Sequence, residues 1–444
     1  MIATAIAGRK RRNTELGLGF LAVVVTIGGY ILLALARGPS LPPDLGVLLG
    51  GIVALYVVAH LAVRRFAPGA DGTLLPLAAL LNGIGFVTIA RLDSGLVDLG
   101  NKDPHLARIQ SVWSAVGVGA FVATLVIVRN IRVLERYTYT FAFAALALLL
   151  VPLVPHIGIT VNGARIWAAL GPLHFQPGEP AKVLWVAFFA GYLTQKRELL
   201  SEGSRSVGRL RIPAARHLGP LTATWGVSIL VLVFERDLGS SLLFFAVFAA
   251  MLYMATERSA YLIGSLALFS AGATAAFHMF GHVRARVQGW LNPWPYRHDD
   301  RGYQIIQSWY AFAAGGVYGK GIGLGIPAQI PYASTDFIFA AVGEELGLIG
   351  TLALVVCFLL IVGSGFRIAV ESSRPFSKLF AAGLTTILGL QTFIIVGGVT
   401  RMIPLTGITL PFVSYGGSSL VANFVILALL LRMSDDNARE RARS

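Results

Sequence analysis

Apolar stretches of membrane-spanning length recur along almost the whole chain, and they constrain its fold more than any other feature of the sequence. A helix needs about 20 predominantly apolar residues to cross a bilayer. With 55% hydrophobic and only 13% charged residues, the chain is too poor in charge for an ordinary soluble protein, whose charged fraction is about a quarter. The turn-punctuated alternation of a membrane β-barrel is absent. The sequence therefore predicts an all-α polytopic membrane protein.

A hydropathy window of about 19 residues predicts twelve helical spans. Their ranges are 15–36, 44–63, 74–92, 107–128, 138–155, 180–195, 217–234, 238–256, 260–279, 337–365, 380–400 and 408–433. Two connectors, 156–179 and 280–336, are much longer than the others. Loops well beyond a dozen residues are uncommon unless they have a function.

Lys and Arg fall mainly in every second connector, and the net charge is +14. The positive-inside rule makes these connectors cytoplasmic, which predicts that both termini lie inside and that the two long connectors lie outside. The excess charge is therefore explained by topology and by attraction to anionic membrane lipid, and no nucleic-acid partner is expected.

Few residues offer metal chemistry. Cys357 is the single cysteine and lies inside a span, which excludes an intrachain disulfide. His278 and His282 have the i,i+4 spacing of zinc ligands, but no third ligand is visible nearby. We interpret them as polar residues at a membrane boundary. The run "YGKGIGLG" lacks the spacing of a phosphate-binding loop, and we interpret it as a flexible loop.

The first outer connector continues into a span as "VNGARIWAALGPLHFQPGEPAKVLW". Pro180 suits the first turn of a helix, which places Glu179 at the N-cap and allows it to pair with Lys182. Arg165 and Lys182 are cations of the kinds that bind a diphosphate, and Trp167 and Glu179 add a ring and an acid to this candidate substrate-binding site. A capped helix with a surface salt bridge explains the same residues equally well. The second connector, with "WLNPWPYRHDDRGYQ", suits either a lipid–water interface or a substrate contact.

An ordered set of motifs carries a family resemblance. The motifs are "NGARIW", "QPGEPAK", "ERDLGSS", "NPW", "GYQ", "TDFIFAAVGEELG", "PLTGITLPFVSYGGSS" and the basic tail. In this order they resemble the SEDS (shape, elongation, division and sporulation) family, and most of all its RodA branch. The resemblance covers residues 74 to 433.

The resemblance implies a ten-span core at 73–433, preceded by an addition of two spans at 1–72 and followed by a basic cytoplasmic tail at 434–444. It also implies a peptidoglycan glycosyltransferase of the bacterial cytoplasmic membrane that polymerises lipid II, the undecaprenyl-diphosphate disaccharide-pentapeptide, for cell elongation and shape. A class B penicillin-binding transpeptidase is the implied partner. Metal dependence is often ascribed to the family, so a divalent cation stays open as a cofactor, but no ligand set carries over to this chain.

The family's essential aspartate falls on Asp336, in "TDFIF". A carboxylate at the outer end of a span can accept the proton of an attacking sugar hydroxyl. Glu344 and Glu345 lie roughly 12–13 Å further along the same helix at 1.5 Å per residue. This exceeds the roughly 5–9.5 Å that separates paired acids in glycosidases. We therefore expect them to be structural, although buried membrane carboxylates are costly enough to keep a functional role open.

A departing diphosphate needs cations rather than a general acid. Arg165 and Lys182 are the candidates, and Arg401, in the connector before "IPLTGITLP", is a third. Asp237 is a rival carboxylate, but its place before "LGSS" is typical of a helix N-cap.

Some positions depart from the family pattern. Family members often carry Arg where Ile166 stands, Lys where Thr406 stands and Asn where Ile395 stands. The usual "Q-P-S-E-L-A-K" is here "QPGEPAK", which keeps the acid and the base.

Other function classes fit part of the sequence. A lipid II flippase or other transporter also needs many spans, buried carboxylates and interrupted helices. A noncatalytic scaffold needs only the exposed loops, and a division-specific family member would share the same motifs.

The charge asymmetry predicts a topology. Reporter fusions near residues 205 and 370 should report the cytoplasm, and fusions near 165 and 300 the outside, because Lys and Arg are retained on the inner side. An outside signal at residue 205 would contradict this arrangement.

Overall fold

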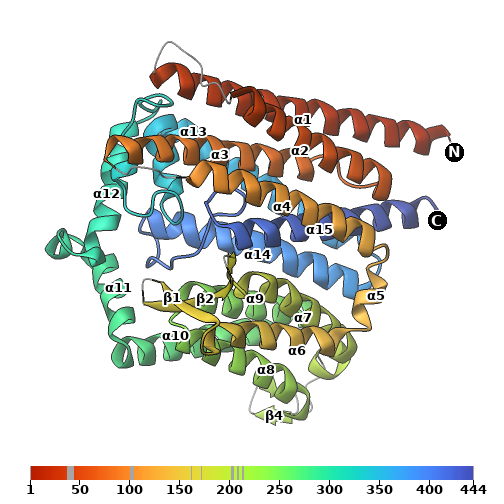
Figure 1. The fold of residues 1–444 in the computed structure, drawn as a ribbon. Helices are drawn as coiled ribbons and strands as arrows, with labels where there is room; N and C mark the ends of the chain where they lie inside the picture. Colours follow the sequence, from red (N-terminus) through yellow and green to blue (C-terminus); the bar gives the residue numbers. More distant parts are fainter. Residues whose placement is uncertain are drawn as a thin grey trace. The chain divides into compact units, whose positions relative to one another are not determined.

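The computed structural model describes residues 2–37, 45–100, 105–161, 163–171, 173–201, 205–207, 210–212 and 215–443. These residues are mostly helical, with five short strands (Figure 1). The helices are α1 (Ile2–Arg37), α2 (Leu45–Phe66), α3 (Leu74–Asp98), α4 (Leu106–Ile127), α5 (Arg132–Glu135), α6 (Thr138–Leu150), α7 (Gly178–Ser201), α8 (Ala215–Phe234), α9 (Leu238–Thr256), α10 (Ser259–Met279), α11 (Gly281–Leu291), α12 (Asp300–Gly315), α13 (Ile338–Glu371), α14 (Pro375–Val399) and α15 (Gly417–Arg441). Three short 3-10 helices are η1 (Val151–Leu153), η2 (Trp294–Tyr296) and η3 (Pro327–Gln329).

The chain forms two compact units. Unit 1 comprises residues 1–129, 288–364 and 391–444, and unit 2 comprises residues 130–287 and 365–390. Helices α11, α13 and α14 each contribute residues to both units.

Unit 1 contains the two N-terminal helices that precede the expected core, and they pack directly onto it. Helix α1 packs along α3, α2 packs against α4, and α15 packs closely along α4 (Figure 1). A glycine permits the close packing of α4 and α15, because a Cβ added at Gly117 of α4 would lie only 2.6 Å from a ring carbon of Phe424 in α15. The N-terminal helices are therefore an integral part of this unit.

Arg432 of α15 joins three carbonyl groups at the ends of two helices in unit 1. Its Nε donates to Val128 O at 2.8 Å, its Nη1 to Phe66 O at 2.6 Å and its Nη2 to Leu125 O at 2.6 Å. The last carbonyls of a helix have no partner within the helix and carry partial negative charge, so a cation suits them. Asp435 is fully buried, lies 3.4 Å from Arg432 Nη1 and accepts a 2.7 Å hydrogen bond from Gly69 N. One buried side chain thus satisfies the ends of both α2 and α4.

Unit 2 is built around α7, which packs against α6 and α9. Aromatic rings fill the contact. Trp185 and Phe189 of α7 stack with their centroids 5.3 Å apart, and Phe189 meets Phe248 of α9 at 5.5 Å. Burying large rings is the main apolar contribution available in such a core.

The predicted spans are largely confirmed as helices. Nine helices among the described residues are long and apolar enough to cross a membrane: α1, α2, α3, α4, α9, α10, α13, α14 and α15, with α1 and α2 counted over Asn13–Ala36 and Gly46–Phe66. The expected spans 138–155, 180–195 and 217–234 coincide with α6 and η1, α7 and α8. The apolar helices Thr138–Leu153 and Trp225–Phe234 are shorter than a span. The number of spans and the side of each terminus stay predictions.

Several expectations were wrong in detail. The predicted all-α fold is confirmed, but the prediction did not include an antiparallel sheet of β1 (Gly158–Val161), β2 (Ala164–Leu170) and β3 (Leu173–Phe175), or a hairpin of β4 (Arg205–Val207) and β5 (Leu210–Ile212). In the first of these, Ile159 pairs with Trp167 and Ala168 with Phe175. The final helix begins at Gly417, not near residue 408. The second long connector contains α11 and α12.

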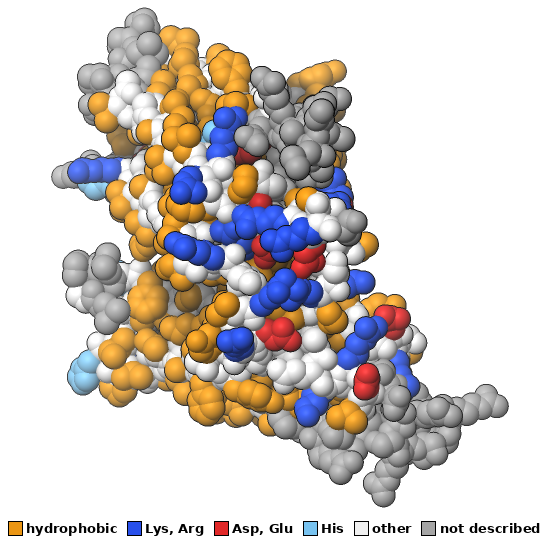
Figure 2. Space-filling view, turned by 90° about the vertical axis from the view of Figure 1, so that its right-hand side faces the viewer, with side chains coloured by type: hydrophobic (Ala, Val, Ile, Leu, Met, Phe, Trp, Pro, Cys, Tyr) orange, Lys and Arg blue, Asp and Glu red, His pale blue; other side chains and the backbone are white. Residues whose placement is uncertain are grey.

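One face of the molecule gathers Lys and Arg side chains, with some carboxylates among them and hydrophobic side chains around them (Figure 2). This is the side of Figure 1 on which both labelled termini lie. The side of the membrane that these cations face stays a prediction from the charge asymmetry of the sequence.

Candidate active site

Asp336 lies in a turn of unit 1, two residues before α13 begins. Its side chain is partly exposed, whereas Phe337 and Ile338, which follow it, are buried. The turn is tight: the amides of Thr335 and Phe337 both donate to Tyr332 O, at 3.1 and 3.2 Å. Tyr332 has φ +55°, in the left-handed region that non-glycine residues rarely adopt. The structure therefore presents this carboxylate at a helix end, as expected.

Helix α13 is broken a short distance further on. Gly347 has φ +66° and ψ −162°, so the helical hydrogen bonds fail there. The segment that follows α12 fills the break: Lys320 N and Gly321 N donate to Glu344 O and Glu345 O at 3.0 and 2.9 Å. In the other direction, Leu348 N and Ile349 N donate to Gly316 O and Val317 O. A left-handed glycine permits this close approach, and the sequence analysis did not anticipate it.

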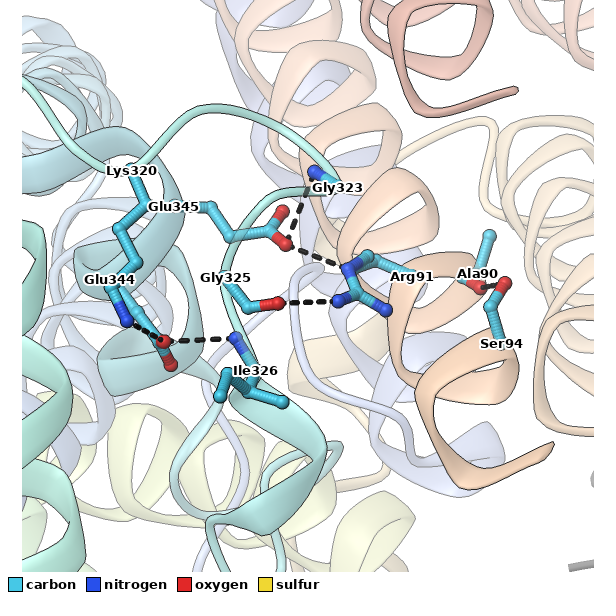
Figure 3. A network of polar contacts seen from close by, with 9 residues as sticks. All are labelled: Ala90, Arg91, Ser94, Lys320, Gly323, Gly325, Ile326, Glu344 and Glu345. Atoms are coloured by element: carbon cyan, nitrogen blue, oxygen red, sulfur yellow. Dashed lines mark hydrogen bonds and ion pairs between the residues drawn. The ribbon is translucent and has the colours of Figure 1, made fainter. Parts of the chain in front are cut away.

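The paired glutamates fix the same segment with their side chains (Figure 3). Glu345 Oε1 lies 2.8 Å from Arg91 Nε of α3 and accepts from Gly323 N at 3.2 Å. Glu344 Oε1 lies 3.2 Å from Lys320 Nζ and accepts from Ile326 N at 2.9 Å. Arg91 Nη2 also donates to Gly325 O at 2.5 Å.

These contacts explain why two carboxylates are buried inside α13. Both bind a cation and a backbone amide, which compensates their desolvation. The geometry supports the structural interpretation of Glu344 and Glu345. It also corrects the interpretation of "YGKGIGLG", because this run is held by hydrogen bonds along residues 319–326.

Arg165 and Trp167 lie on β2 of unit 2, and both are partly exposed. Arg165 N donates to Glu235 O at 3.0 Å, and its Nη2 donates to Val154 O at 3.3 Å. Its Nε is buried and has no hydrogen-bond partner among the described residues. Val154 O thus holds the Nη2 end of the Arg165 guanidinium, and Nε is a donor without a partner among the described residues.

Glu179 and Lys182 form the expected ion pair. Lys182 Nζ lies 2.5 Å from Glu179 Oε2, and both side chains are largely buried. Helix α7 begins at Gly178, two residues earlier than expected, so Glu179 lies within the first turn instead of at the N-cap. A carboxylate is favourable at either place because the helix N-terminus carries partial positive charge.

The connector between α8 and α9 holds two buried carboxyl groups. Asp237 accepts a hydrogen bond from Ser240 N at 2.9 Å, which confirms its expected role as the N-cap of α9. Burial raises the pKa of Asp237, while Ser240 and Arg286 act to lower it. Burial, together with the neighbouring Asp237, raises the pKa of Glu235 to about 8, so Glu235 is mostly neutral at pH 7.

Glu235 is a buried acid beside the candidate site residues that was not singled out from the sequence. It is 3% exposed, and its Oε1 has no hydrogen-bond partner among the described residues. An acid at the end of an apolar span, two residues before a second acid, was the available signal.

Arg401 of unit 1 is committed to backbone contacts. Its Nε and Nη2 donate to Trp290 O and Leu291 O at 2.7 and 2.6 Å, and Trp290 Nε1 donates back to Arg401 O at 3.1 Å. Its guanidinium lies 5.3 Å from the ring centroid of Trp309. The structure therefore places Arg401 as an anchor between the end of α11 and the connector after α14.

In the described part of the chain, no group of three or more His, Cys, Asp and Glu residues is arranged to hold a metal ion. His278 and His282 belong to two different helices, α10 and α11, so the single helical face assumed for them does not exist. Burial, with Arg236 and Arg286 nearby, lowers the pKa of His282.

The chain matches the family of cell cycle proteins FtsW, RodA and SpoVE over residues 72–439. It belongs to this family. It is 44% identical to the peptidoglycan glycosyltransferase RodA of Mycobacterium tuberculosis, over 96% of this chain and 90% of that protein. It is 32% identical to the probable peptidoglycan glycosyltransferase FtsW of Geobacter metallireducens, over 82% of this chain and 94% of that protein. The chain thus lies on the RodA side of the FtsW, RodA and SpoVE family.

Solved structures agree. The Thermus thermophilus rod shape determining protein RodA is 26% identical with a TM-score of 0.57, over 83% of this chain and 97% of that one. A structure described as the coordination of polymerization and crosslinking by a peptidoglycan synthase complex contains a chain that is 28% identical, with a TM-score of 0.66. It covers 83% of this chain and 98% of that one. With these relatives and its apolar helices, this family member is a multi-pass protein of the bacterial cytoplasmic membrane.

The buried ion pair between Arg91 and Glu345 predicts a large effect on the stability of this protein. Glu345→Gln should lower the free energy of unfolding by about 3–5 kcal/mol, because it leaves the Arg91 guanidinium buried without its counter-charge. Thermal unfolding in detergent would measure this. Glu257→Gln is the matched control, because it removes the exposed pair with Arg197 and should cost about 0–1 kcal/mol. Equal unfolding temperatures for Glu345→Gln and the parent would contradict the assigned role.

Proposed function

We propose that this protein is a peptidoglycan glycosyltransferase that polymerises lipid II at the outer face of the cytoplasmic membrane during cell elongation, with Asp336 as its general base. The single observation that carries the activity is the 44% identity to RodA glycosyltransferases over almost the whole chain. Support for Asp336 comes from its geometry: a partly exposed carboxylate at the start of α13, on a turn that hydrogen bonds hold in place.

The reaction joins two sugars. The 4-hydroxyl oxygen of the acceptor attacks the anomeric carbon of the donor, and the bond from that carbon to the diphosphate oxygen breaks. The Asp336 carboxylate takes the hydroxyl proton, and the bonding electrons leave with undecaprenyl diphosphate. General-base catalysis of this kind contributes typically about 10²–10⁴-fold to a rate. The leaving group departs as an anion, so it needs cations and no proton donor.

We assign the diphosphate contacts to Arg165 and Lys182. The buried Nε of Arg165 has no hydrogen-bond partner among the described residues and is a donor that a phosphate oxygen could satisfy. Lys182 is neutralised in part by Glu179 at 2.5 Å, which holds its ammonium in one place. Trp167 is proposed to contact the substrate through its partly exposed ring. Arg401 is proposed as a third cation near the substrate, although its backbone contacts make it foremost an anchor.

We also propose a class B penicillin-binding transpeptidase as the partner of this protein. A solved relative is described as part of a complex that coordinates polymerization with crosslinking. A glycan strand leaving a polymerase must meet a crosslinking enzyme, so a stable association has a clear chemical purpose.

Substitutions of Asp336 test its proposed role as the base. Asp336→Asn keeps the shape of the side chain but removes the proton acceptor, so lipid II polymerisation should fall by about 10²–10⁴-fold. Asp336→Glu keeps the base but displaces it, and an error of about 1 Å can cost roughly 10²-fold. Glycan synthesis by the purified protein would be assayed beside thermal unfolding and transpeptidase pull-down.

Asp299→Asn is the matched control, because this aspartate caps α12 in the same unit and Asn caps a helix equally well. Full synthesis by Asp336→Asn would remove Asp336 as the base. Transfer of lipid II between leaflets without any polymer, by the parent protein, would point instead to a flippase.

Substitutions of Arg165 and Lys182 test the proposed diphosphate contacts. Arg165→Ala should reduce polymerisation, and Arg165→Lys should restore it only in part because the bidentate fork is lost. Lys182→Ala should also reduce polymerisation, but it leaves buried Glu179 without its counter-charge and so affects folding as well.

The double variant Glu179→Gln/Lys182→Met separates these two effects. It removes both charges, so its thermal stability should approach that of the parent while its activity stays low. If Arg165→Ala and the double variant both polymerise lipid II at the parental rate, the diphosphate contacts lie elsewhere.

A further inference from the structure

A second connector of unit 1, residues 409–416, is hydrogen-bonded to the turn that carries Asp336. Ser414 Oγ donates to Thr335 O at 2.6 Å, and Tyr415 N donates to Ser334 O at 2.8 Å. Two consecutive residues of this connector therefore bind the two carbonyls that immediately precede Asp336. Residues 409–416 are the second half of the connector between α14 and α15, and the sequence predicted all of them to be helical, within the span 408–433.

The Ser414 hydroxyl has two partners at once. While it donates to Thr335 O, it accepts a hydrogen bond from Leu410 N at 2.9 Å. Ser414 is 4% exposed, so water is a poor substitute for either partner. A buried polar group that loses its partner carries a substantial free-energy cost. Ala at this position would leave both Leu410 N and Thr335 O without the hydroxyl.

The peptide group explains why this contact matters for the next residue. The oxygen of residue 335 and the Cα of residue 336 lie in one plane, because the peptide bond is planar. A hydrogen bond that fixes Thr335 O therefore fixes the orientation of the plane from which the Asp336 side chain projects. The Tyr415 bond to Ser334 O restrains the preceding plane in the same way.

The connector is itself held rigidly, so it can act as a reference point. Phe412 is 2% exposed and adopts φ +63°, a strained conformation that persists only when the surroundings impose it. Gln391 Nε2 of α14 donates to Thr409 O at 2.8 Å, and Thr409 Oγ1 donates to Ser419 Oγ of α15 at 2.7 Å. Helices α14 and α15 thus support the segment that contains Ser414.

We propose that Ser414 is a positioning residue for Asp336: its hydroxyl sets the orientation of the 335–336 peptide and so the place of the catalytic carboxylate. The inference rests on the proposed role of Asp336 as the base. Ser414 acts through Asp336 and does not touch the reacting atoms.

The expected kinetic effect follows from the size of the displacement. Errors on the order of 1 Å in a reacting group cost roughly 10²-fold. Ser414→Ala should therefore lower kcat by about 10–100-fold. KM for lipid II should change little, because the diphosphate contacts belong to Arg165 and Lys182.

The test compares Ser414→Ala with Ser414→Thr, which keeps the hydroxyl and should recover most of kcat. Ser308→Ala is the matched control. Ser308 is fully buried in the same unit and donates to Ile305 O and Val399 O, far along the chain from the Asp336 turn. It should keep the parental kcat per folded molecule, with the folded fraction measured by thermal unfolding and size-exclusion chromatography.

A double-mutant cycle with Asp336→Glu identifies the route of the effect. If Ser414 acts by placing the carboxylate, adding Ser414→Ala to Asp336→Glu should cost clearly less than Ser414→Ala costs alone. Full additivity, or a parental kcat for Ser414→Ala, would overturn the proposal. If Ser414→Ala does not fold, Ser414→Cys takes its place with the same criteria, because a thiol is only a weak donor.

The result for Asp336→Asn distinguishes a failure of the positioning role of Ser414 from a failure of the base role of Asp336. If Asp336→Asn is inactive and Ser414→Ala has the parental kcat, only the positioning role fails. If Asp336→Asn is fully active, the base assignment fails, and the positioning role fails with it.

Discussion

The backbone hydrogen bonds that fill the break in α13 set the path that the chain takes from α12 toward Asp336. In a membrane, every backbone amide and carbonyl must find a partner within the protein, since lipid offers none. At Gly347 the helix leaves such groups unpaired, and the segment after α12 supplies matching ones through four backbone hydrogen bonds. The chain is thereby drawn back against α13 before it reaches the turn at Asp336. Arg91, Glu344 and Glu345 then fix its return path with buried charges.

Charge in this protein is used sparingly and mostly for structure. Glu344 and Glu345 bind a loop, Asp237 caps a helix, and Asp435 accepts from a backbone amide. Each of these carboxylates has a partner that compensates its burial, as buried charges require. Glu235 differs, because one of its oxygens has no partner among the described residues and its pKa is raised to about 8. A neutral acid is the form that such a site tolerates.

The sequence was informative wherever a feature is local. Span positions follow from hydropathy, the Glu179–Lys182 pair from helical spacing, and the Asp237 cap from the residue type before a helix. It failed where the cause is a contact distant along the chain. The kink at Gly347 requires the segment after α12, the contacts of Arg401 require the end of α11, and the small sheet requires three segments to pair. Periodicity and composition carry no record of these partners, so the prediction of an all-α protein held for the helices but did not include the short strands.

Arg432 has a consequence for the order in which this membrane protein assembles. Its guanidinium binds the end carbonyls of α2 and α4, yet it lies on α15, which is synthesised after both of them. Domains made early in translation can often complete their folding before the rest of the chain emerges. Here the contacts of Arg432 with the ends of α2 and α4 can form only after α15 has been synthesised. Helices α2 and α4 therefore reach their final contacts only when Arg432, which lies 304 to 366 residues further along the chain, joins them.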